Sequence, residues 1–227
     1  MSYIQREIQP QFTKETPPKA IVIFGARQIG KTTLLTELAK SEESVRWFNG
    51  DSIADHAQLK FHSTTDVELT LRQADVIVID EAQRFTDIGL ILKQLVDVNI
   101  RLNLGKKIFA TGSSSLELAK GVKESAMGRL IQRQMWPLSI TEIAASKSWG
   151  EVCQSIERLM IYGTYPAVFT DPAHAELTLR NYCDGMLYKD LFSLANIRHN
   201  DKFMYLVKHL AYNIGSEVNY DNLAREI

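Results

Sequence analysis

A glycine-rich stretch that ends in lysine and threonine constrains this chain more than any other feature. It runs from Gly25 to Thr32 and follows an apolar segment, residues 20–24, with the composition of a buried parallel strand. Such glycines let consecutive backbone N–H groups turn inward around phosphates, while the lysine reaches the outer phosphates and the threonine hydroxyl ligates magnesium. The stretch therefore predicts a loop that binds a nucleoside triphosphate with Mg²⁺. The residues expected to bind it are Gly25, Ala26, Arg27, Gln28, Ile29, Gly30, Lys31, Thr32 and Thr33.

A second motif places two acidic residues at the end of an apolar run. Residues 76–79 are β-branched and apolar, as in a central parallel strand, and Asp80 and Glu81 follow them. Because ligands bind at the carboxyl ends of strands in open α/β sheets, we expect Asp80 to hold the magnesium ion together with Thr32. Glu81 is expected to polarise an attacking water, which favours hydrolysis over phosphoryl transfer to an acceptor substrate. The alternative is a helix N-terminus that carries acidic residues.

A third polar group follows the strand predicted at residues 107–111. A polar side chain at the tip of a strand between the two motif strands can touch both the γ-phosphate and the attacking water. Thr111 and Ser113 are the candidates for this sensor. The serines at 113–115 can instead cap a helix predicted at residues 116–125, because serine is a preferred N-cap residue, and the two roles are compatible.

The order of the elements predicts an α/β fold with a parallel sheet of five strands. Strands are expected at residues 20–24, 45–49, 76–79, 107–111 and 130–136, and helices at about 33–40 and 88–98. The segment between residues 50 and 70 is polar and weakly periodic. Pro137 ends the last strand, and Ser139 and Glu142 have the spacing of a helix capping box.

Composition and missing motifs narrow the function. The chain has 227 residues, 45% of them apolar, and a formal net charge of −1, so no bulk charge attracts nucleic acid. The N-terminal residues lack the apolar core of a signal peptide, and no apolar run approaches membrane-spanning length, so we expect a cytoplasmic protein with no membrane partner. No guanine-reading motif or transporter signature is present, which favours adenine. Cys153 and Cys183 lie in separate segments and are expected to be buried thiols.

In order along the chain, these motifs resemble a family of AAA+ ATPases of bacteria and archaea, the AAA domain family 14 type. The resemblance rests on Gly25–Leu35, Ile79–Arg84, Thr111–Ser115, and Gly128 and Arg129 followed by Pro137–Ser139 with Glu142. It implies an ATPase domain similar to the STAND branch of P-loop proteins, with ATP and Mg²⁺ as cofactors. Members of that family usually continue into a winged helix and a C-terminal domain of unknown function with a nuclease-like fold. The chain is therefore expected to be truncated before that domain.

The resemblance implies two further sites. Arg129 follows the helix predicted after the sensor strand, where AAA+ proteins place an arginine finger that reaches the γ-phosphate of a neighbouring subunit. A surface arginine paired with an acid is the alternative. Residues 162–166 resemble the Gly-x-Pro element of STAND ATPases, in which the proline, here Pro166, packs against adenine. Thr164 replaces the usual second glycine of that element, and a plain turn between helices is the alternative.

Three domains are expected from the motifs and the resemblance together. They are a P-loop AAA+-like ATPase domain at residues 1–147, a helical lid at 148–200 and the start of a truncated winged helix at 201–227. The expected function is Mg²⁺-dependent ATP hydrolysis coupled to lid movement. Two alternatives stay open: a nucleotide-controlled switch with little turnover, and the ATPase module of a DNA-acting protein with a nuclease-like C-terminal domain. The expected partners are ATP or ADP, a homo-oligomer, and DNA for the full-length protein but not specifically for this fragment.

Overall fold

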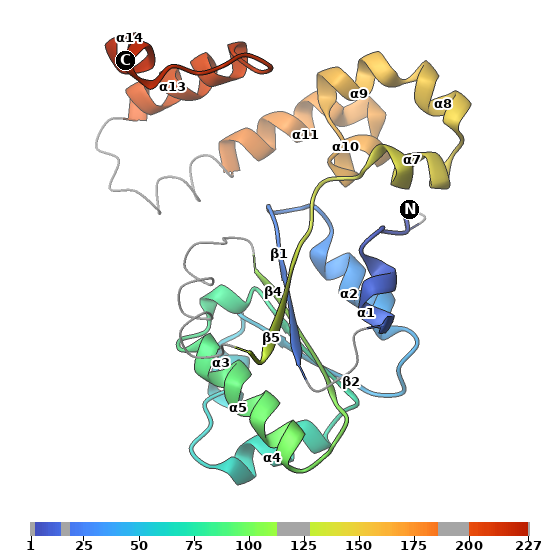
Figure 1. Ribbon diagram of the computed structural model, residues 1–227, viewed down its shortest axis with the longest axis vertical. Helices are drawn as coiled ribbons and strands as arrows, with labels where there is room; N and C mark the ends of the chain where they lie inside the picture. The colour runs from blue at the N-terminus through green and yellow to red at the C-terminus, as the bar shows by residue number, and fades with distance from the viewer. Residues whose placement is uncertain (1–2, 15–18, 113–127, 186–199, 227) are drawn as a thin grey trace. The chain divides into compact units, whose positions relative to one another are not determined.

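A computed structural model describes residues 3–14, 19–112, 128–185 and 200–226 of the chain. The chain divides into two compact units, Met1–Leu179 and Arg180–Ile227. The first unit contains a parallel sheet with helices on both of its faces (Figure 1). The candidate sensor Ser113 and the helix expected at residues 116–125 lie outside the described residues.

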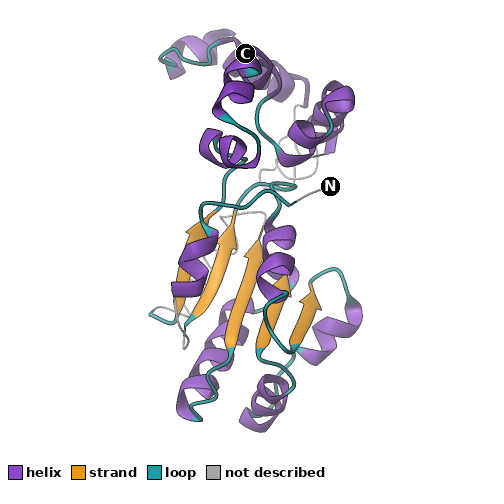
Figure 2. Cartoon of the chain, turned by 90° about the vertical axis from the view of Figure 1, so that its right-hand side faces the viewer, coloured by secondary structure: helices purple, strands orange, loops and turns teal. Residues whose placement is uncertain are grey.

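The sheet has five parallel strands in the order β2, β3, β4, β1, β5, and Figure 2 shows their arrows pointing the same way. The strands are β1 (Ala20–Phe24), β2 (Val45–Asn49), β3 (Val76–Asp80), β4 (Lys107–Gly112) and β5 (Leu130–Gln134). This confirms the predicted α/β fold and its parallel sheet. Because β1 and β3 both pair with β4, the loop after β1 and the acidic residues Asp80 and Glu81 at the end of β3 lie at the same carboxyl end of the strands, on either side of the β4 tip.

Helices cover both faces of the sheet. They are α1 (Gln9–Lys14), α2 (Lys31–Ala39), α4 (Thr64–Arg72) and α5 (Ile88–Arg101), whereas α3 (Ile53–Gln58), after β2, has no buried residue. On one face, side chains of α4 and α5 form a cluster with strand residues such as Val22 and Ile79. On the other face, side chains of α1 and α2 pack with strand residues such as Ile23 and Val78. Burial on both faces explains why β1 and β3 are continuous apolar runs rather than alternating ones.

The polar segment between residues 50 and 70 contains α3 and α4, which the weak periodicity did not predict. Each of these helices begins after a serine. The Ser52 side chain accepts a hydrogen bond from the amide of Asp55, and Ser63 forms a full capping box with Asp66. These caps satisfy amide groups that have no partner inside the helix, so the serines were the available signal.

A group of short helices follows the sheet within the first unit. These are α7 (Ile140–Ser146), α8 (Trp149–Gln154), α9 (Ile156–Tyr162), α10 (Pro166–Thr170) and the first part of α11 (Ala175–Tyr182), with a 3-10 turn at Pro172–His174; another 3-10 turn, Ala82–Arg84, lies between β3 and α5. The predicted capping box is confirmed at the start of α7, because Ser139 Oγ accepts the amide of Glu142 and the Glu142 carboxylate accepts the amide of Ser139, each at 3.0 Å. Leu138, Ile143 and Val152 form the small buried core of this group.

The second unit contains α13 (Asn200–Tyr212) and α14 (Tyr220–Glu226). The side-chain oxygen of Asn219 accepts hydrogen bonds from the amides of Asp221 and Asn222, which caps α14. The winged helix and the three domain boundaries given above stay predictions.

The expectation of buried thiols is wrong. Cys153 and Cys183 are both exposed. Cys153 lies on α8, a helix of six residues in which Val152 is the buried residue, so that helix packs with one side only. Within the described parts of the chain, no helix is both long and apolar enough to cross a membrane.

Candidate nucleotide-binding site

The phosphate-binding loop connects β1 to α2, and its backbone requires the glycines that the motif supplies. A Cβ atom at Gly25 would lie 2.3 Å from Ile29 Cδ1 and 2.4 Å from the carbonyl oxygen of Met135, so a larger residue would collide with the β5 end. Gly30, the N-cap of α2, has a φ of 94°, a left-handed conformation that residues with a Cβ rarely adopt. The sharp turn from strand to helix therefore depends on both positions.

Lys31 lies inside the curve of this loop. Its Nζ donates hydrogen bonds to the carbonyl oxygens of Gly25, at 2.9 Å, and Ala26, at 2.7 Å, and its side chain is only 6% exposed. A buried ammonium needs acceptors or a bound anion to replace its lost hydration. The loop thus holds a positive charge where the sequence predicts the phosphates.

Two oxygen groups meet where the magnesium ion is predicted. The Thr32 hydroxyl, in the first turn of α2, donates a 2.9 Å hydrogen bond to Oδ2 of Asp80 at the end of β3. Both groups are hard oxygen donors of the kind that Mg²⁺ prefers, and protein sites for this ion typically supply one or two such ligands beside phosphate oxygens and water. The residues present therefore fit the ion.

Thr111 lies at the tip of β4, between the predicted metal ligand and the predicted base. It is completely buried, and its hydroxyl donates to Oδ1 of Asp80. The same hydroxyl oxygen accepts the amide of Glu81 at 3.2 Å. The structure thus brings Thr111, Asp80 and Glu81 together, whereas the alternative candidate Ser113 is outside the described residues.

Glu81 has an unusual backbone conformation. Its φ of 49° and ψ of 44° are left-handed, which is uncommon outside glycine and costs of the order of 1–3 kcal/mol. Its carboxylate accepts a hydrogen bond from Nε2 of Gln83. Such strained positions persist where the surroundings hold them, and they are frequent at functional sites.

Gly50, which sequence reasoning did not single out, packs directly against this strained turn. Its amide donates to the carbonyl oxygen of Asp80 at 2.9 Å. A Cβ at Gly50 would lie 2.3 Å from the carbonyl oxygen of Glu81 and 2.9 Å from Cβ of Arg84. The signal in the sequence was a glycine directly after the second strand, but only the fold shows what approaches it.

Arg129 lies at the amino ends of the strands, opposite to the end that carries the phosphate-binding loop. Its carbonyl oxygen accepts the amide of Ala20 at 3.0 Å, at the start of β1, whereas the phosphate-binding loop follows the end of that strand. Its guanidinium Nε forms an ion pair with Oδ1 of Asp97 on α5. Arg129 therefore does not reach the phosphate site of its own chain, and its pairing with an acid matches the alternative given for it. A role at the site of a neighbouring subunit stays a prediction.

Pro166 begins α10 as its first residue, a position that suits proline because the first helical amide has no intrahelical partner. The preceding Tyr165 packs against the cluster that contains Ile29 and Met135, under the phosphate-binding loop. Burial raises the pKa of the Tyr165 phenol above its usual value. This contact brings the element around Pro166 close to the loop, as an adenine-contacting role requires, but the role itself stays a prediction.

Comparison with known proteins places this site in a family. The AAA domain family matches residues 17–144, a range that contains the loop, Asp80, Glu81 and the whole sheet. The chain belongs to this family. As a member, it is a nucleotide-binding P-loop ATPase of the AAA+ class, which confirms the family expected from the motifs. A domain of unknown function, DUF8612, matches residues 153–227.

Two proteins similar in sequence carry only the description of an uncharacterized protein. The chain is 24% identical over 239 residues to protein MJ1544 of Methanocaldococcus jannaschii, covering 97% of this chain and 52% of that protein. It is 30% identical over 177 residues to protein Rv2008c of Mycobacterium tuberculosis, covering 77% of this chain and 36% of that protein. The chain thus spans about half or less of these relatives. The Walker-type ATPase PABY2304 of Pyrococcus abyssi has a similar fold, with a TM-score of 0.52 and 14% identity over 85% of this chain and 75% of that one.

Proposed function

We propose that this chain binds ATP with Mg²⁺ and hydrolyses it to ADP and phosphate. The loop amides and Lys31 hold the phosphates, Thr32 and Asp80 hold the ion, and Glu81 accepts a proton from the attacking water. When bound, Mg²⁺ neutralises charge on the phosphate oxygens. Thr111 bonds to the Asp80 carboxylate and the Glu81 amide and so holds both residues in position. It is also the proposed sensor of the γ-phosphate.

The observation that carries this proposal is a continuous row of hydrogen bonds along the carboxyl ends of the strands. Thr32 donates to one oxygen of Asp80, and Thr111 donates to the other and accepts the amide of Glu81. One residue of α2 and one of β4 therefore converge on two adjacent positions at the end of β3. Such convergence suits a reaction in which an ion and a water molecule act on the same phosphoryl group.

We further propose that the state of the nucleotide reaches the helices that follow the sheet. Tyr165, next to Pro166, packs on the apolar cluster that contains Ile29 of the loop. A change in the loop on hydrolysis would therefore alter the packing of α10. This change in packing is the lid movement that we propose. Assembly into a homo-oligomer belongs to the same proposal, because Arg129 lies away from the phosphate site of its own chain and could act as a finger only at the site of a neighbouring subunit.

A slow nucleotide-controlled switch is the second candidate. The observation in its favour is the hydrogen bond from Gln83 Nε2 to the Glu81 carboxylate. A carboxylate that already accepts a side-chain hydrogen bond must give up part of this interaction before it orients a water molecule. A chain of this kind would bind nucleotide tightly and turn it over slowly.

The test is ATP affinity and turnover measured for the wild type, for Lys31→Ala and for Lys60→Ala. Lys60 is an exposed lysine of the same unit and serves as the matched control. We expect Lys31→Ala to lose roughly tenfold to a hundredfold in affinity, since it removes the buried cation of the loop, and Lys60→Ala to behave like the wild type. Unchanged ATP affinity in Lys31→Ala would refute the proposal that this loop binds the phosphates. Turnover measured with and without DNA then separates a DNA-stimulated ATPase from an autonomous enzyme, and tight binding without turnover supports the switch.

A further inference from the structure

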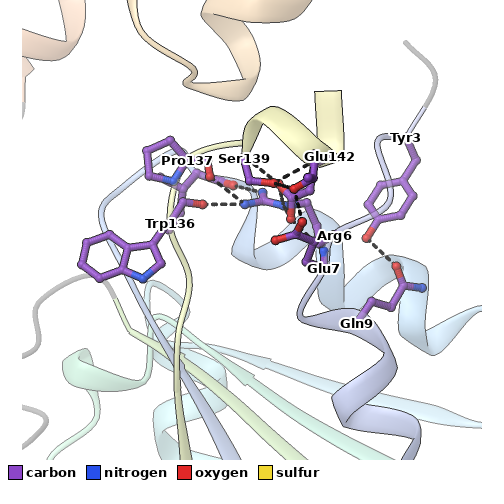
Figure 3. Close-up of polar contacts among 10 residues, drawn as sticks. Tyr3, Arg6, Glu7, Gln9, Trp136, Pro137, Ser139 and Glu142 are labelled. Atoms are coloured by element: carbon purple, nitrogen blue, oxygen red, sulfur yellow. Dashed lines mark hydrogen bonds and ion pairs between the residues drawn. The ribbon is translucent and has the colours of Figure 1, made fainter. Parts of the chain in front are cut away.

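Arg6 is a buried cation that the proposed hydrolysis does not use. Its side chain is 5% exposed, and its guanidinium reaches three separate segments of the first unit (Figure 3). Nε donates to the Glu142 carboxylate at 3.0 Å, Nη1 donates to the carbonyl oxygen of Ile29 at 2.8 Å, and Nη2 donates to the carbonyl oxygen of Trp136. These acceptors come from α7, from the phosphate-binding loop and from the segment after β5.

The carboxylate that faces Arg6 is itself fixed in place. Glu142 is 6% exposed, and its oxygens also accept the amides of Glu7, at 2.8 Å, and Ser139, at 3.0 Å. A buried ion pair is stable only when hydrogen bonds satisfy the groups that burial removes from water, and this pair meets that condition. The guanidinium therefore has one defined position, with its planar fork directed at several acceptors at once.

The contact with Ile29 is the one that bears on phosphate binding. No cis peptide bond occurs in the described parts of the chain, so the carbonyl of Ile29 and the following N–H of Gly30 point in opposite directions. While Arg6 holds that carbonyl, the N–H of Gly30 must point away from Arg6. Gly30 is one of the loop residues whose amides are expected to surround the phosphates, and its flexible backbone would otherwise let this peptide rotate.

The N-terminal segment around Arg6 joins two apolar clusters. Ile4 packs against the small core of the helices after the sheet. Ile8 and Phe12 pack on the cluster that contains Ile29. Arg6 thus lies on a short stretch of chain that is anchored on both sides, which limits how far the guanidinium can withdraw from the loop.

We propose that Arg6 is a positioning residue of the phosphate-binding loop. It fixes the orientation of the Ile29–Gly30 peptide so that the Gly30 amide can bind phosphate. Through its ion pair with Glu142, it also connects that peptide to the start of α7. This role rests on the proposed nucleotide site and adds a residue far outside the loop motif. Because coupling between two equilibria is reciprocal, bound phosphate should in turn stabilise the N-terminal segment.

The first test compares a double variant, Arg6→Met with Glu142→Gln, against Glu142→Gln alone. Replacement of a buried ion pair by neutral groups of similar size is often tolerated, so the double variant should fold. In the single variant a glutamine oxygen can still accept from Arg6, and the contact with Ile29 stays, but the buried guanidinium loses its counter-charge, so Glu142→Gln should be the less stable of the two variants. We expect ADP affinity, measured by calorimetry with Mg²⁺, to fall roughly tenfold or more in the double variant and by less than about threefold in Glu142→Gln.

Thermal unfolding separates this role from simple stabilisation. A residue that only stabilises the fold would lower the unfolding midpoint and leave the ADP affinity of the folded protein equal in the two variants, which would overturn the proposal. If the wild type itself did not bind ADP, the proposed nucleotide function would fail instead, and the two failures are therefore distinguishable.

The second test uses hydrogen exchange and needs no variant. The amide of Glu7 donates to Glu142 and reports on the segment around Arg6. We expect ADP to slow the exchange of amides in residues 4–8 of the wild type. Equal exchange with and without saturating ADP would contradict the coupling, whatever the variants show.

Discussion

The Thr32 hydroxyl donates a 2.9 Å hydrogen bond to the Asp80 carboxylate, although the two residues are 48 positions apart and belong to different elements. The contact exists because β1 and β3 both pair with β4, so that the helix after β1 and the last residue of β3 meet at the carboxyl end of the sheet. An hydroxyl and a carboxylate so placed can take part in one coordination shell without rearrangement of the backbone. The topology of the sheet, rather than either motif alone, therefore builds the proposed metal site.

Replacement of Asp80 by asparagine should weaken the metal-dependent part of ATP binding. The side chain keeps its shape, but it loses the charge that favours Mg²⁺ and one of the two oxygens that accept from Thr32 and Thr111. We expect the gain in ATP affinity on adding Mg²⁺ to fall by about tenfold or more, with little change in the presence of a chelator. Titration of ATP with and without Mg²⁺ measures both quantities.

Asp75→Asn is the matched control for that change. Asp75 directly precedes β3 and Asp80 ends it, so the two carboxylates lie at opposite ends of one strand. Asp75 accepts hydrogen bonds from Lys106 and Ser44 and has no contact with the loop in the structure as described. An equal loss of metal-dependent affinity in both variants would mean that Asp80 acts through general charge rather than at the ion.

Glu81→Gln should separate binding from hydrolysis. Glutamine has a similar shape and keeps the Thr111 contact, which involves the backbone amide, but it cannot accept a proton from water. ATP affinity should survive, and turnover should fall by a factor of the order of 100 to 10,000, as expected for a lost general base. Single-turnover assays, with the protein in saturating excess over ATP, measure the chemical step. Equal rates in an active wild type and the variant would exclude the role.

Gly50→Ala should disturb the Glu81 turn without touching any proposed catalytic atom. The new Cβ would lie 2.3 Å from the Glu81 carbonyl oxygen, which is a backbone atom and has little freedom to move away. We expect a loss of about 1–3 kcal/mol in unfolding free energy, as is typical of overpacking, and a lower turnover. Gly150→Ala is the control, because the nearest atom to its Cβ would be 3.9 Å away. Denaturant unfolding of both variants would contradict this prediction if their midpoints agreed.

Features that depend on local pattern could be predicted from the sequence. Lys31 and Asp80 are recognisable because an apolar β-branched run followed by a glycine loop or an acid can be read within about ten residues. The parallel sheet follows from the alternation of such runs with helices. The capping box at Ser139 and Glu142 is equally local, because its partners are three residues apart.

Features that depend on contacts between residues far apart in the sequence could not be predicted. Gly50 matters because the turn at Glu81 packs against it, and Arg6 matters because three separate segments direct acceptors at it. In the sequence Arg6 is one charged residue in a polar N-terminal stretch, which is the usual composition of a solvated segment. Cys153 shows the reverse error, since thiols are commonly buried but α8 packs only one of its sides.

Tyr3 should make stability depend on pH in the alkaline range. Burial raises the pKa of its phenol from 10.0 to about 12, although the nearby charge of Arg6 acts in the opposite direction. Below pH 10 the phenol is protonated in both states and its contribution is complete. Between about pH 10 and 12 the unfolded chain loses this proton and the folded chain keeps it, so the unfolded state binds fewer protons and stability falls as pH rises.

Tyr3→Phe removes the titrating group, and this gives the measurement. The difference in unfolding free energy between the wild type and Tyr3→Phe should be constant below pH 10. Above it, the wild type should lose stability relative to the variant, as followed by urea unfolding at a series of pH values. A difference that stays flat up to pH 12 would mean that the Tyr3 environment is open to water.

Arg129 and Asp97 allow a test of whether the arginine acts across subunits. The two side chains form an ion pair and are both partly exposed, so the pair itself contributes at most about 1 kcal/mol of stability. If Arg129 is a finger, Arg129→Ala should lower turnover without weakening ATP binding, because its charge is needed chiefly in the transition state. Turnover per subunit should then rise with protein concentration in the wild type and stay flat in Arg129→Ala. Asp97→Ala breaks the same ion pair but leaves the guanidinium in place, so it should keep the concentration dependence. Identical kinetics in the two variants would show instead that the ion pair is the whole role of Arg129.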